Sequence, residues 1–224
     1  MDPEASLALT CLTADLIASR KAPDRAGVQA RVEDALQKVN RSLGGAIAVP
    51  FSVTLGDEWQ GLLTSPAAAL EADLLFRRLL YPLPLAAGIG AGGVATPLRE
   101  RTALMDGLAF QRAREALVRA QERRGPATVL ASGDALLDEA VNALCLLLHA
   151  LSRRWTAKQV RSLEAFLAHG TEEAAARALG VAQPTIHQSL DRSQAKIYLE
   201  ARDALLRFAS RYPLGSPVER GGAR

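Results

Sequence analysis

The sequence has few cysteines and few histidines, and this shortage excludes several kinds of site. Its two cysteines, Cys11 and Cys145, lie inside apolar stretches and are far apart in the chain. Neither has a Cys or His neighbour at metal-ligand spacing, so we predict buried structural thiols rather than a disulfide or a metal site. His149 and His169 are equally isolated, and we do not expect them to bind a metal.

The sequence also lacks a long apolar run and a basic N-terminus. No uninterrupted apolar stretch approaches the roughly 20 residues that a membrane-spanning helix needs. The first four residues, Met-Asp-Pro-Glu, are acidic where a secretory signal would be basic. With 49% hydrophobic and 23% charged residues, the composition is that of a soluble, folded protein. We therefore expect a cytoplasmic protein with no membrane contact.

Charge is distributed unevenly along the 224 residues. Residues 153–224 carry a net charge of +5, whereas residues 1–152 carry −2. A basic part joined to a slightly acidic part is what phosphate contact by one end of the chain requires, although an ordinary solvated basic surface has the same charge. We predict an N-terminal domain over residues 1–132, a connecting helix over 133–152, a helical domain over 153–212 and a flexible tail over 213–224.

The first 95 residues show the pattern strand, helix, hairpin, helix, strand. The predicted elements occupy residues 6–16, 27–43, 46–55, 59–64, 66–81 and 85–95. This order predicts an α+β, ferredoxin-like (βαββαβ) domain. In that topology the first and third strands are antiparallel neighbours at the centre of the sheet. Asp15, at the end of the first strand, is therefore expected close to Asp57 and Glu58 in the hairpin.

Carboxylates gathered at one end of a sheet repel one another unless a cation lies between them. Mg²⁺ with nucleotide phosphates is the usual partner, so Asp15, Asp57 and Glu58 are the predicted metal ligands. Phosphate would be held by residues after the first strand and by N–H groups that open the next helix. The predicted ligand-binding residues are Ser19, Arg20, Lys21, Gly56 and Gly90.

A structural explanation of the same residues stays open. Asp57 follows Gly56, and Gly-Asp is good chemistry for a hairpin turn. Asp15 can cap the loop before the next helix. The glycines of residues 88–93 can serve only to let the backbone pack closely against a neighbour.

The middle of the chain predicts two helices separated by a short strand. Residues 105–123 are amphipathic and end before Gly125-Pro126, which no helix passes easily. Residues 128–131 are a candidate edge strand. The helix over residues 133–151 carries an apolar seam that either packs on the sheet or pairs with its copy in a homodimer. The seam consists of Leu137, Val141, Leu144, Leu148 and Leu151.

Residues 173–190 predict a helix-turn-helix. Ala176 is small enough for a second helix to cross closely, and Gly180 can adopt the left-handed conformation of a tight turn. Pro184 suits the first turn of the second helix. The apolar side chains expected between the two helices are Ala175, Leu179, Val181 and Ile186.

The second helix of this pair is predicted to contact DNA. Its outward side chains suit base edges and phosphates, since Gln pairs with adenine and Arg with guanine or phosphate. The predicted DNA-binding residues are Gln183, Thr185, His187, Gln188 and Arg192. Because helix-turn-helix units also form protein contacts, an adaptor that binds another protein stays an alternative. A homodimer is favoured because a helix-turn-helix protein usually gains affinity by binding two half-sites of DNA.

Four motifs in order give the chain a resemblance to a known family. TADLIASR at residues 13–20, TLGDEWQG at 54–61, AGIGAGG at 87–93 and DGLAFQRARE at 106–115 resemble the SatD family of bacterial proteins. The resemblance covers most of the chain and implies a C-terminal helix-turn-helix.

The first three motifs are also similar, more distantly, to the palm domains of class III nucleotide cyclases and GGDEF diguanylate cyclases. That similarity implies two metal ions held by Asp15 and Asp57, with Glu58 at the acidic position of the GGDEF motif. Leu55 and Trp59 depart from the pattern. Gln111 and Glu115 stand where cyclases have the Asn and Arg that stabilise the transition state. We therefore do not expect cyclase turnover.

Taken together, these features predict a bacterial DNA-binding, transcription-regulatory protein of the SatD type. Its cyclase-like domain would sense a nucleotide or another phosphorylated ligand. The alternative is a metal-dependent enzyme that makes or cleaves a nucleotide at the carboxylates, with an accessory helix-turn-helix.

Overall fold

The computed structural model describes residues 8–18, 24–123, 125 and 127–212. The N-terminal elements follow the predicted order closely. They are β1 (Ala8–Leu16), α1 (Arg25–Leu43), a 3₁₀ turn η2 (Gly44–Ala46), β2 (Ile47–Leu55), β3 (Glu58–Leu63), α2 (Pro66–Leu80) and β4 (Leu85–Gly93). The Ser65 side chain caps α2 by accepting from the Ala68 N–H, and Pro66 occupies the first turn.

The five strands form one sheet in the order β2-β3-β1-β4-β5. Strand β1 is antiparallel to both β3 and β4, which confirms the predicted central pairing. The fifth strand, β5 (Ala127–Ala131), joins the edge parallel to β4, after η3 (Thr102–Leu104) and helix α3 (Leu108–Gln121). The register places Asp15 directly opposite Glu58. The sheet therefore brings the predicted carboxylates to one end.

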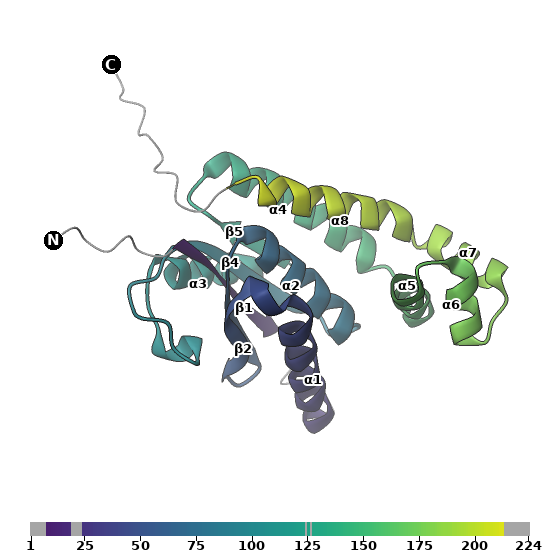
Figure 1. The fold of residues 1–224 in the computed structure, drawn as a ribbon, viewed down its shortest axis with the longest axis horizontal. Coiled ribbons are helices and arrows are strands. Elements are labelled where there is room, and N and C mark those ends of the chain that lie inside the picture. The colour runs from purple at the N-terminus through teal and green to yellow at the C-terminus, as the bar shows by residue number, and fades with distance from the viewer. Residues whose placement is uncertain (1–7, 19–23, 124, 126, 213–224) are drawn as a thin grey trace, which may run out of the picture.

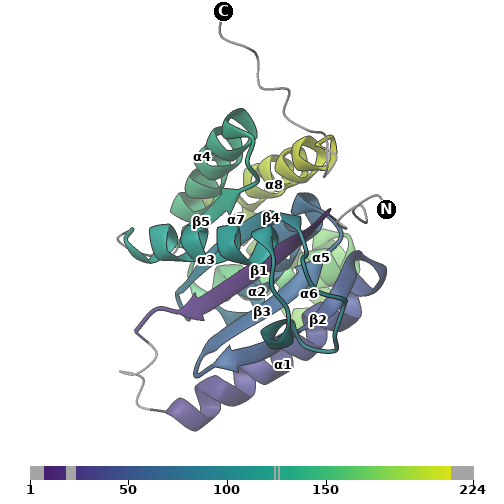
Figure 2. The same ribbon diagram turned by 90° about the vertical axis from the view of Figure 1, so that its left-hand side faces the viewer.

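Helices cover both faces of this sheet (Figure 2). Leu12, Ala14 and Leu16 of β1 are buried on the face covered by α1 and α2. The alternate residues Leu9 and Cys11 are buried on the opposite face, where α3 packs. Cys11 and Cys145 are both free and fully buried, as predicted, and burial raises the pKa of each thiol to about 12.

The glycines of β4 let α3 approach the sheet at backbone contact distance. A Cβ added to Gly88 would lie 2.2 Å from the Ala113 carbonyl oxygen, and one added to Gly90 would lie 2.2 Å from the Ala113 nitrogen. The facing side of α3 is buried and consists largely of alanines. The Gly-rich motif of residues 87–93 is thus explained by helix packing, the structural alternative that the sequence left open.

The C-terminal third is helical and folds back onto the sheet domain. It contains α4 (Ala135–Ser152), α5 (Ala157–His169), α6 (Glu172–Leu179), α7 (Gln183–Arg192) and α8 (Ala195–Ser210). Helix α8 runs beside α4 and contacts α2, while α5, α6 and α7 lie together at the far end (Figure 1). One hydrophobic cluster includes Leu12 of β1 and Leu205 of α8. The hydrophobic core thus continues across residue 153. The domain boundary that we predict there stays a prediction.

The apolar seam of α4 faces its own subunit. Leu137, Val141 and Leu148 are buried, and α4 contacts β5 and α8. Among the described residues, α4 is the one helix long and apolar enough to cross a bilayer by length and composition. Its buried side forms part of the core. Of the two arrangements predicted for the seam, packing within the subunit is the one observed.

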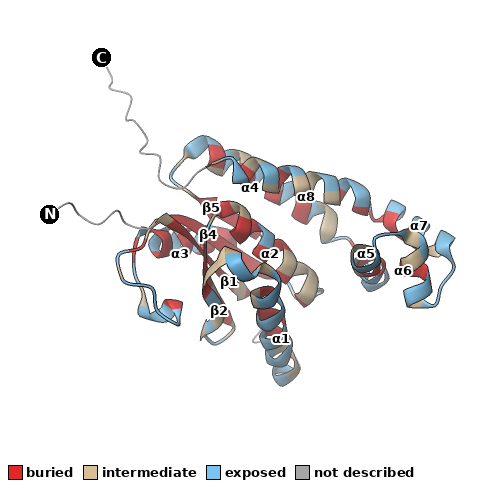
Figure 3. Cartoon of the chain, viewed as in Figure 1, coloured by how far each residue is buried: buried red, intermediate tan, exposed pale blue. Residues whose placement is uncertain are grey.

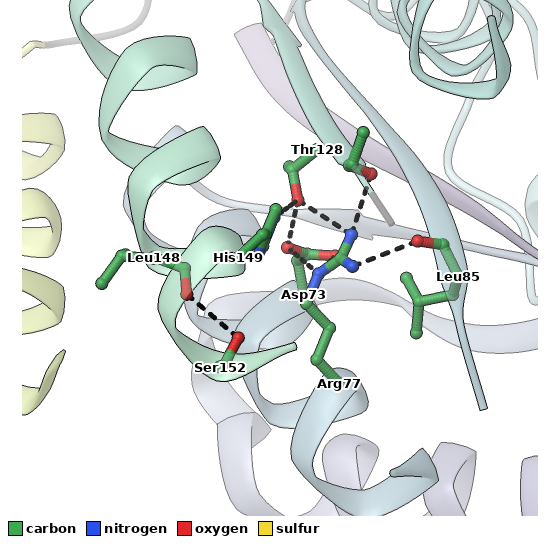
Figure 4. Close-up of polar contacts among 8 residues, drawn as sticks. Asp73, Arg77, Leu85, Thr128, Leu148, His149 and Ser152 are labelled. Atoms are coloured by element: carbon green, nitrogen blue, oxygen red, sulfur yellow. Dashed lines mark hydrogen bonds and ion pairs between the residues drawn. The ribbon is translucent and has the colours of Figure 1, made fainter. Parts of the chain in front are cut away.

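A buried polar network joins α2, β5 and α4 (Figure 4). Arg77 Nε donates to both oxygens of Asp73, at 3.1 and 3.0 Å, and Arg77 Nη2 donates to Thr128 Oγ1 at 2.9 Å. The Thr128 hydroxyl donates to Asp73 at 2.6 Å and lies 2.7 Å from His149 Nε2. Since that hydroxyl has one proton, His149 satisfies the network as a neutral ring protonated at Nε2. Burial lowers the pKa of His149 well below its usual range, with Arg77 adding to the effect.

Candidate functional site

Three carboxylates gather where β1 ends beside the β2–β3 hairpin; we call Asp15, Asp57 and Glu58 the acidic corner. Asp15 and Glu58 are paired across the sheet, and Asp57 lies in the tight turn before Glu58. Strand alternation directs Asp15 to the face covered by α3. Glu58 is buried and Asp57 is half-buried. The predicted closeness of Asp15 to Glu58 is confirmed by their register.

Helix α3 supplies two side chains that reach the acidic corner. Arg114 donates to Glu58 through both terminal nitrogens, at 2.6 and 2.7 Å. Gln121, two turns further along the helix, donates from Nε2 to Asp15 Oδ2 at 2.8 Å. The Thr54 hydroxyl donates to Glu58 Oε1 at 3.1 Å. Glu58 is therefore held by a bidentate ion pair, the geometry that arginine forms best with carboxylates.

The acidic corner carries more negative charge than Arg114 neutralises. The pKa of Asp15 is raised, first because the carboxyl is partly removed from water and second because Asp57 lies nearby. Glu58 adds to this rise, whereas the hydrogen bond from Gln121 opposes it. The pKa of Arg114 is raised by its hydrogen bonds to Glu58. The corner is thus an electrostatic environment that favours a cation.

The donor set available to a cation is smaller than the sequence suggested. Glu58 is paired with Arg114, which leaves Asp57 and the Oδ1 atom of Asp15, whose Oδ2 accepts from Gln121, as carboxylate oxygens that could bind a metal. Mg²⁺ is commonly bound by one or two protein carboxylates together with water or substrate phosphates, so this pair fits it. Within the described part of the chain, no three His, Cys, Asp or Glu side chains converge as a metal-binding group. The metal site that the sequence predicts at Asp15, Asp57 and Glu58 stays a prediction.

The predicted phosphate-binding residues fall in three different settings. Ser19, Arg20 and Lys21 lie outside the described residues. Gly56 occupies the exposed hairpin turn with a φ of 61°, whereas Gly90 is buried beneath α3. At the start of α1, the Asp24 side chain accepts from the Gly27 N–H at 2.8 Å. Asp24, rather than Asp15, caps this helix, so one of its N–H groups is already paired with a carboxylate.

The helices α6 and α7 are joined by a short turn at Gly180, whose φ of 64° is left-handed as predicted. Ala175 and Ile186 are buried between neighbouring helices, and α5 packs against both α6 and α7. Val181 was predicted to be buried, but 39% of its surface is exposed. That prediction is wrong, because the turn carries Val181 outward while Leu190 and Ser189 of α7 fill the inner side.

The outer face of α7 is open to solvent (Figure 3). Gln183, His187, Gln188 and Arg192 are exposed, and Thr185 is half-buried. Asp191 is also exposed on this face and adds one negative charge. The five predicted DNA-binding side chains therefore share one short helix, and all of them retain some exposure.

Two of these side chains are held by Glu172, at the start of α6. Gln183 Nε2 donates to Glu172 Oε2 at 2.8 Å, and His187 Nδ1 lies 3.2 Å from the same oxygen. Lys196 of α8 forms an ion pair with Glu172 at 2.8 Å, which is the main cause of its lowered pKa. Glu172 thus fixes α7 relative to α6 and α8, and it leaves Gln188 and Arg192 unpaired among the described residues.

A comparison with protein families identifies the chain. The model of the SatD family matches residues 9–208. The chain belongs to the SatD family. No protein of curated function matches it.

The solved structures to which this SatD protein is similar include nucleotide cyclases and a GGDEF domain. The adenylyl cyclase CyaB from P. aeruginosa aligns with 13% identity over 55% of this chain and 76% of that chain, with a TM-score of 0.44. The guanylate cyclase domain of RhGC from Catenaria anguillulae, in complex with GTP, aligns with 13% identity over 56% and 79%, with a TM-score of 0.42. A microbial GGDEF domain with cyclic di-GMP aligns with 20% identity over 57% and 82%, with a TM-score of 0.38.

The charge balance of the acidic corner predicts how Asp15 of the SatD protein titrates. We expect Asp57→Asn to lower the raised pKa of Asp15, because it removes a neighbouring negative charge. Carboxyl ¹³C NMR titration measures this directly. Glu71→Gln, at an exposed position on α2, is the control and should leave Asp15 unchanged. If Asp57→Asn had no more effect than the control, the two carboxylates would not interact.

The raised pKa of Asp15 also makes the stability of the fold depend on pH. The folded state binds the Asp15 proton more tightly than the unfolded chain, so this group stabilises the fold fully below its ordinary pKa of 3.8. That contribution is lost as the pH rises through the raised pKa. Asp15→Asn should therefore flatten the fall in unfolding free energy over this window.

Proposed function

We propose that this SatD-family protein binds DNA through α7 and regulates transcription, with α6, the Gly180 turn and α7 acting as a helix-turn-helix. The observation that carries the proposal is the two-sided character of α7. Ile186 and Leu190 anchor one side in the core, whereas Gln188 and Arg192 stand in solvent on the other. A helix supported in this way presents a rigid row of polar side chains, which is what major-groove recognition requires.

Charge supports the same proposal. The net charge of +5 on residues 153–224 contrasts with −2 on the remainder, and phosphate attraction supplies most non-specific DNA affinity. Arg192 makes no side-chain ion pair with any described residue, so its charge is available to a phosphate or a guanine. Gln183 and His187 are paired with Glu172, and we assign them the lesser part in base contact.

DNA binding is tested by fluorescence anisotropy with duplexes of mixed sequence at several salt concentrations. We expect Arg192→Ala and Gln188→Ala each to weaken binding by about 1–3 kcal/mol, and Arg192→Ala also to reduce the salt dependence. Arg119→Ala, which removes an exposed arginine of α3, is the matched control. Equal losses in Arg192→Ala and Arg119→Ala, with no loss in Gln188→Ala, would mean that general charge, and not α7, attracts the DNA.

The acidic corner is the proposed sensor. We assign Asp15 and Asp57 as the residues that hold Mg²⁺, and the metal would in turn bind the phosphates of a nucleotide. Arg20 of the segment before α1 would add a cation. Saturating nucleotide with Mg²⁺ should then change the affinity for DNA, and an unchanged affinity would remove the sensing part of the proposal.

An enzyme that processes a nucleotide is the second candidate. One observation favours it: Arg114 places a cation at the acidic corner, although the sequence comparison with cyclases had indicated none. Incubation with each nucleoside triphosphate and Mg²⁺ separates the candidates. Product that disappears in Asp57→Ala would favour the enzyme.

We also propose a homodimer, formed by the outer face of α4 rather than by its buried seam. Leu136, Leu146 and Leu147 are exposed by 70%, 52% and 62%. Two copies of α4 packed antiparallel would bury these three leucines against one another and remove them from water.

The dimer is tested by sedimentation equilibrium. We expect a two-chain mass for the intact protein and a one-chain mass for Leu147→Glu, because two buried carboxylates would face each other across the interface. Ile197→Glu is the control, since Ile197 is exposed by 58% but belongs to α8. A one-chain mass for the unaltered protein would end this proposal.

A further inference from the structure

A cavity of about 300 Å³ lies between the sheet domain and the C-terminal helices, and its lining includes none of the three acidic-corner carboxylates. Its walls come from the segment that joins α2 to β4, from the end of α4, and from α5 and α8. The wall residues that matter here are Leu83, Leu85, His149, Trp155, Val160 and Tyr198. This volume is at the lower end of the range for sites that bind small organic molecules.

The buried polar network (Figure 4) reaches the cavity through Arg77 and His149, which form part of its lining. Arg77 uses four of its five N–H groups, because it donates to Asp73, to Thr128 and to the carbonyl oxygens of Leu85 and Ala127. His149 is neutral for the reason given above. This wall is therefore rigid and brings no uncompensated charge to the cavity.

The other two arginines of the wall differ in how they are paired. Arg78 Nε lies 2.9 Å from Glu164 Oε1, so the charge of Arg78 is compensated. Arg153 is exposed and makes no side-chain ion pair with any described residue. Among the residues that the structure describes, no carboxylate lines the cavity. The cavity consequently presents one uncompensated positive charge beside an apolar, aromatic interior.

We propose that this cavity binds a small aromatic monoanion, a ring system that carries one carboxylate or sulfonate. The ring would lie against Trp155 and Tyr198, and the anionic group would meet Arg153. Because Val160 belongs to α5, which supports α6 and α7, an occupant would also fix these helices relative to the sheet domain. The site goes beyond the proposed function and does not depend on it.

The probe for this site is 8-anilinonaphthalene-1-sulfonate, whose emission rises when it leaves water. We expect saturable binding of one molecule per chain to the full-length protein. Arg153→Gln should weaken it about tenfold, since an ion pair of this kind contributes on the order of one decade in affinity. Arg154→Gln, the neighbouring exposed arginine that does not line the cavity, should leave it unchanged.

Two further comparisons separate the cavity from general apolar adsorption. The uncharged analogue N-phenyl-1-naphthylamine should bind about tenfold more weakly than the sulfonate, for the same reason. Val160→Trp should abolish binding by filling the space, with circular dichroism confirming the fold. Because Arg153 is exposed, Arg153→Gln should fold and still tests the site if Val160→Trp does not fold. Equal affinity of Arg153→Gln and Arg154→Gln, or binding that does not saturate, would overturn the proposal.

Discussion

Asp73→Ala is expected to lower the free energy of unfolding by about 3–5 kcal/mol, because it leaves the guanidinium of Arg77 without its partner. The Asp73 side chain is 1% exposed and that of Arg77 is 12% exposed, so water cannot replace the lost carboxylate. Thr128 loses an acceptor in the same variant. Denaturation by urea, followed by circular dichroism, measures the loss.

Asp34→Ala is the matched control for this experiment. Asp34 and Lys38 form an ion pair of the same i, i+4 spacing, but their side chains are 57% and 48% exposed. We expect the control to cost no more than about 0.5 kcal/mol. Replacing both partners, in Asp73→Leu with Arg77→Met, should restore much of the stability because no buried charge remains unpaired. Similar losses in Asp73→Ala and Asp34→Ala would show that the network is not buried in solution.

Gly90→Ala is the second large prediction. The new Cβ would lie 2.2 Å from the Ala113 nitrogen and 2.3 Å from the Ala109 oxygen, both of them backbone atoms of α3. A side chain can rotate away from such a contact, but a helix backbone has to move as a unit. We therefore expect a loss of at least about 3 kcal/mol, the upper end for an overpacked core, or failure to fold.

The displacement of α3 should also be visible at the acidic corner. If the Gly90→Ala protein folds, the Arg114–Glu58 pair should separate, since Arg114 moves with α3. Gly45→Ala is the control, because nothing lies within 4 Å of its added Cβ. It should be neutral or slightly stabilising, as alanine is favoured over glycine in helical turns. Identical unfolding of the two variants would contradict the close packing of α3 on β4.

The order of elements could be predicted because each one has a local signal. The spacing of Val32, Leu36 and Val39 predicts the helix α1, and the Gly56-Asp57 turn predicts the hairpin. The pairing of β1 with β3, and with it the position of Asp15 opposite Glu58, followed from the order alone.

The contacts that complete each site could not be predicted, because they join segments far apart in the sequence. Arg114 reaches Glu58 across 56 positions and Gln121 reaches Asp15 across 106. The seven-residue separation of Arg114 and Gln121 was the one local signal that these two side chains lie on the same side of a helix. The return of α8 onto α2 and α4 was missed for a similar reason, since an amphipathic helix does not indicate which surface it covers.

DNA contact by α7 is tested most directly by mapping the DNA that the protein occupies across the genome. The intact protein is compared with the Gln188→Ala, Arg192→Ala double variant and with Arg119→Ala. Full-length variants are needed because removing residues after 153 would also remove α8 from the core. We predict discrete occupied sites for the intact protein and for Arg119→Ala, and their loss in the double variant. Occupancy that is the same in all three proteins, or absent from all of them, would contradict DNA contact by α7.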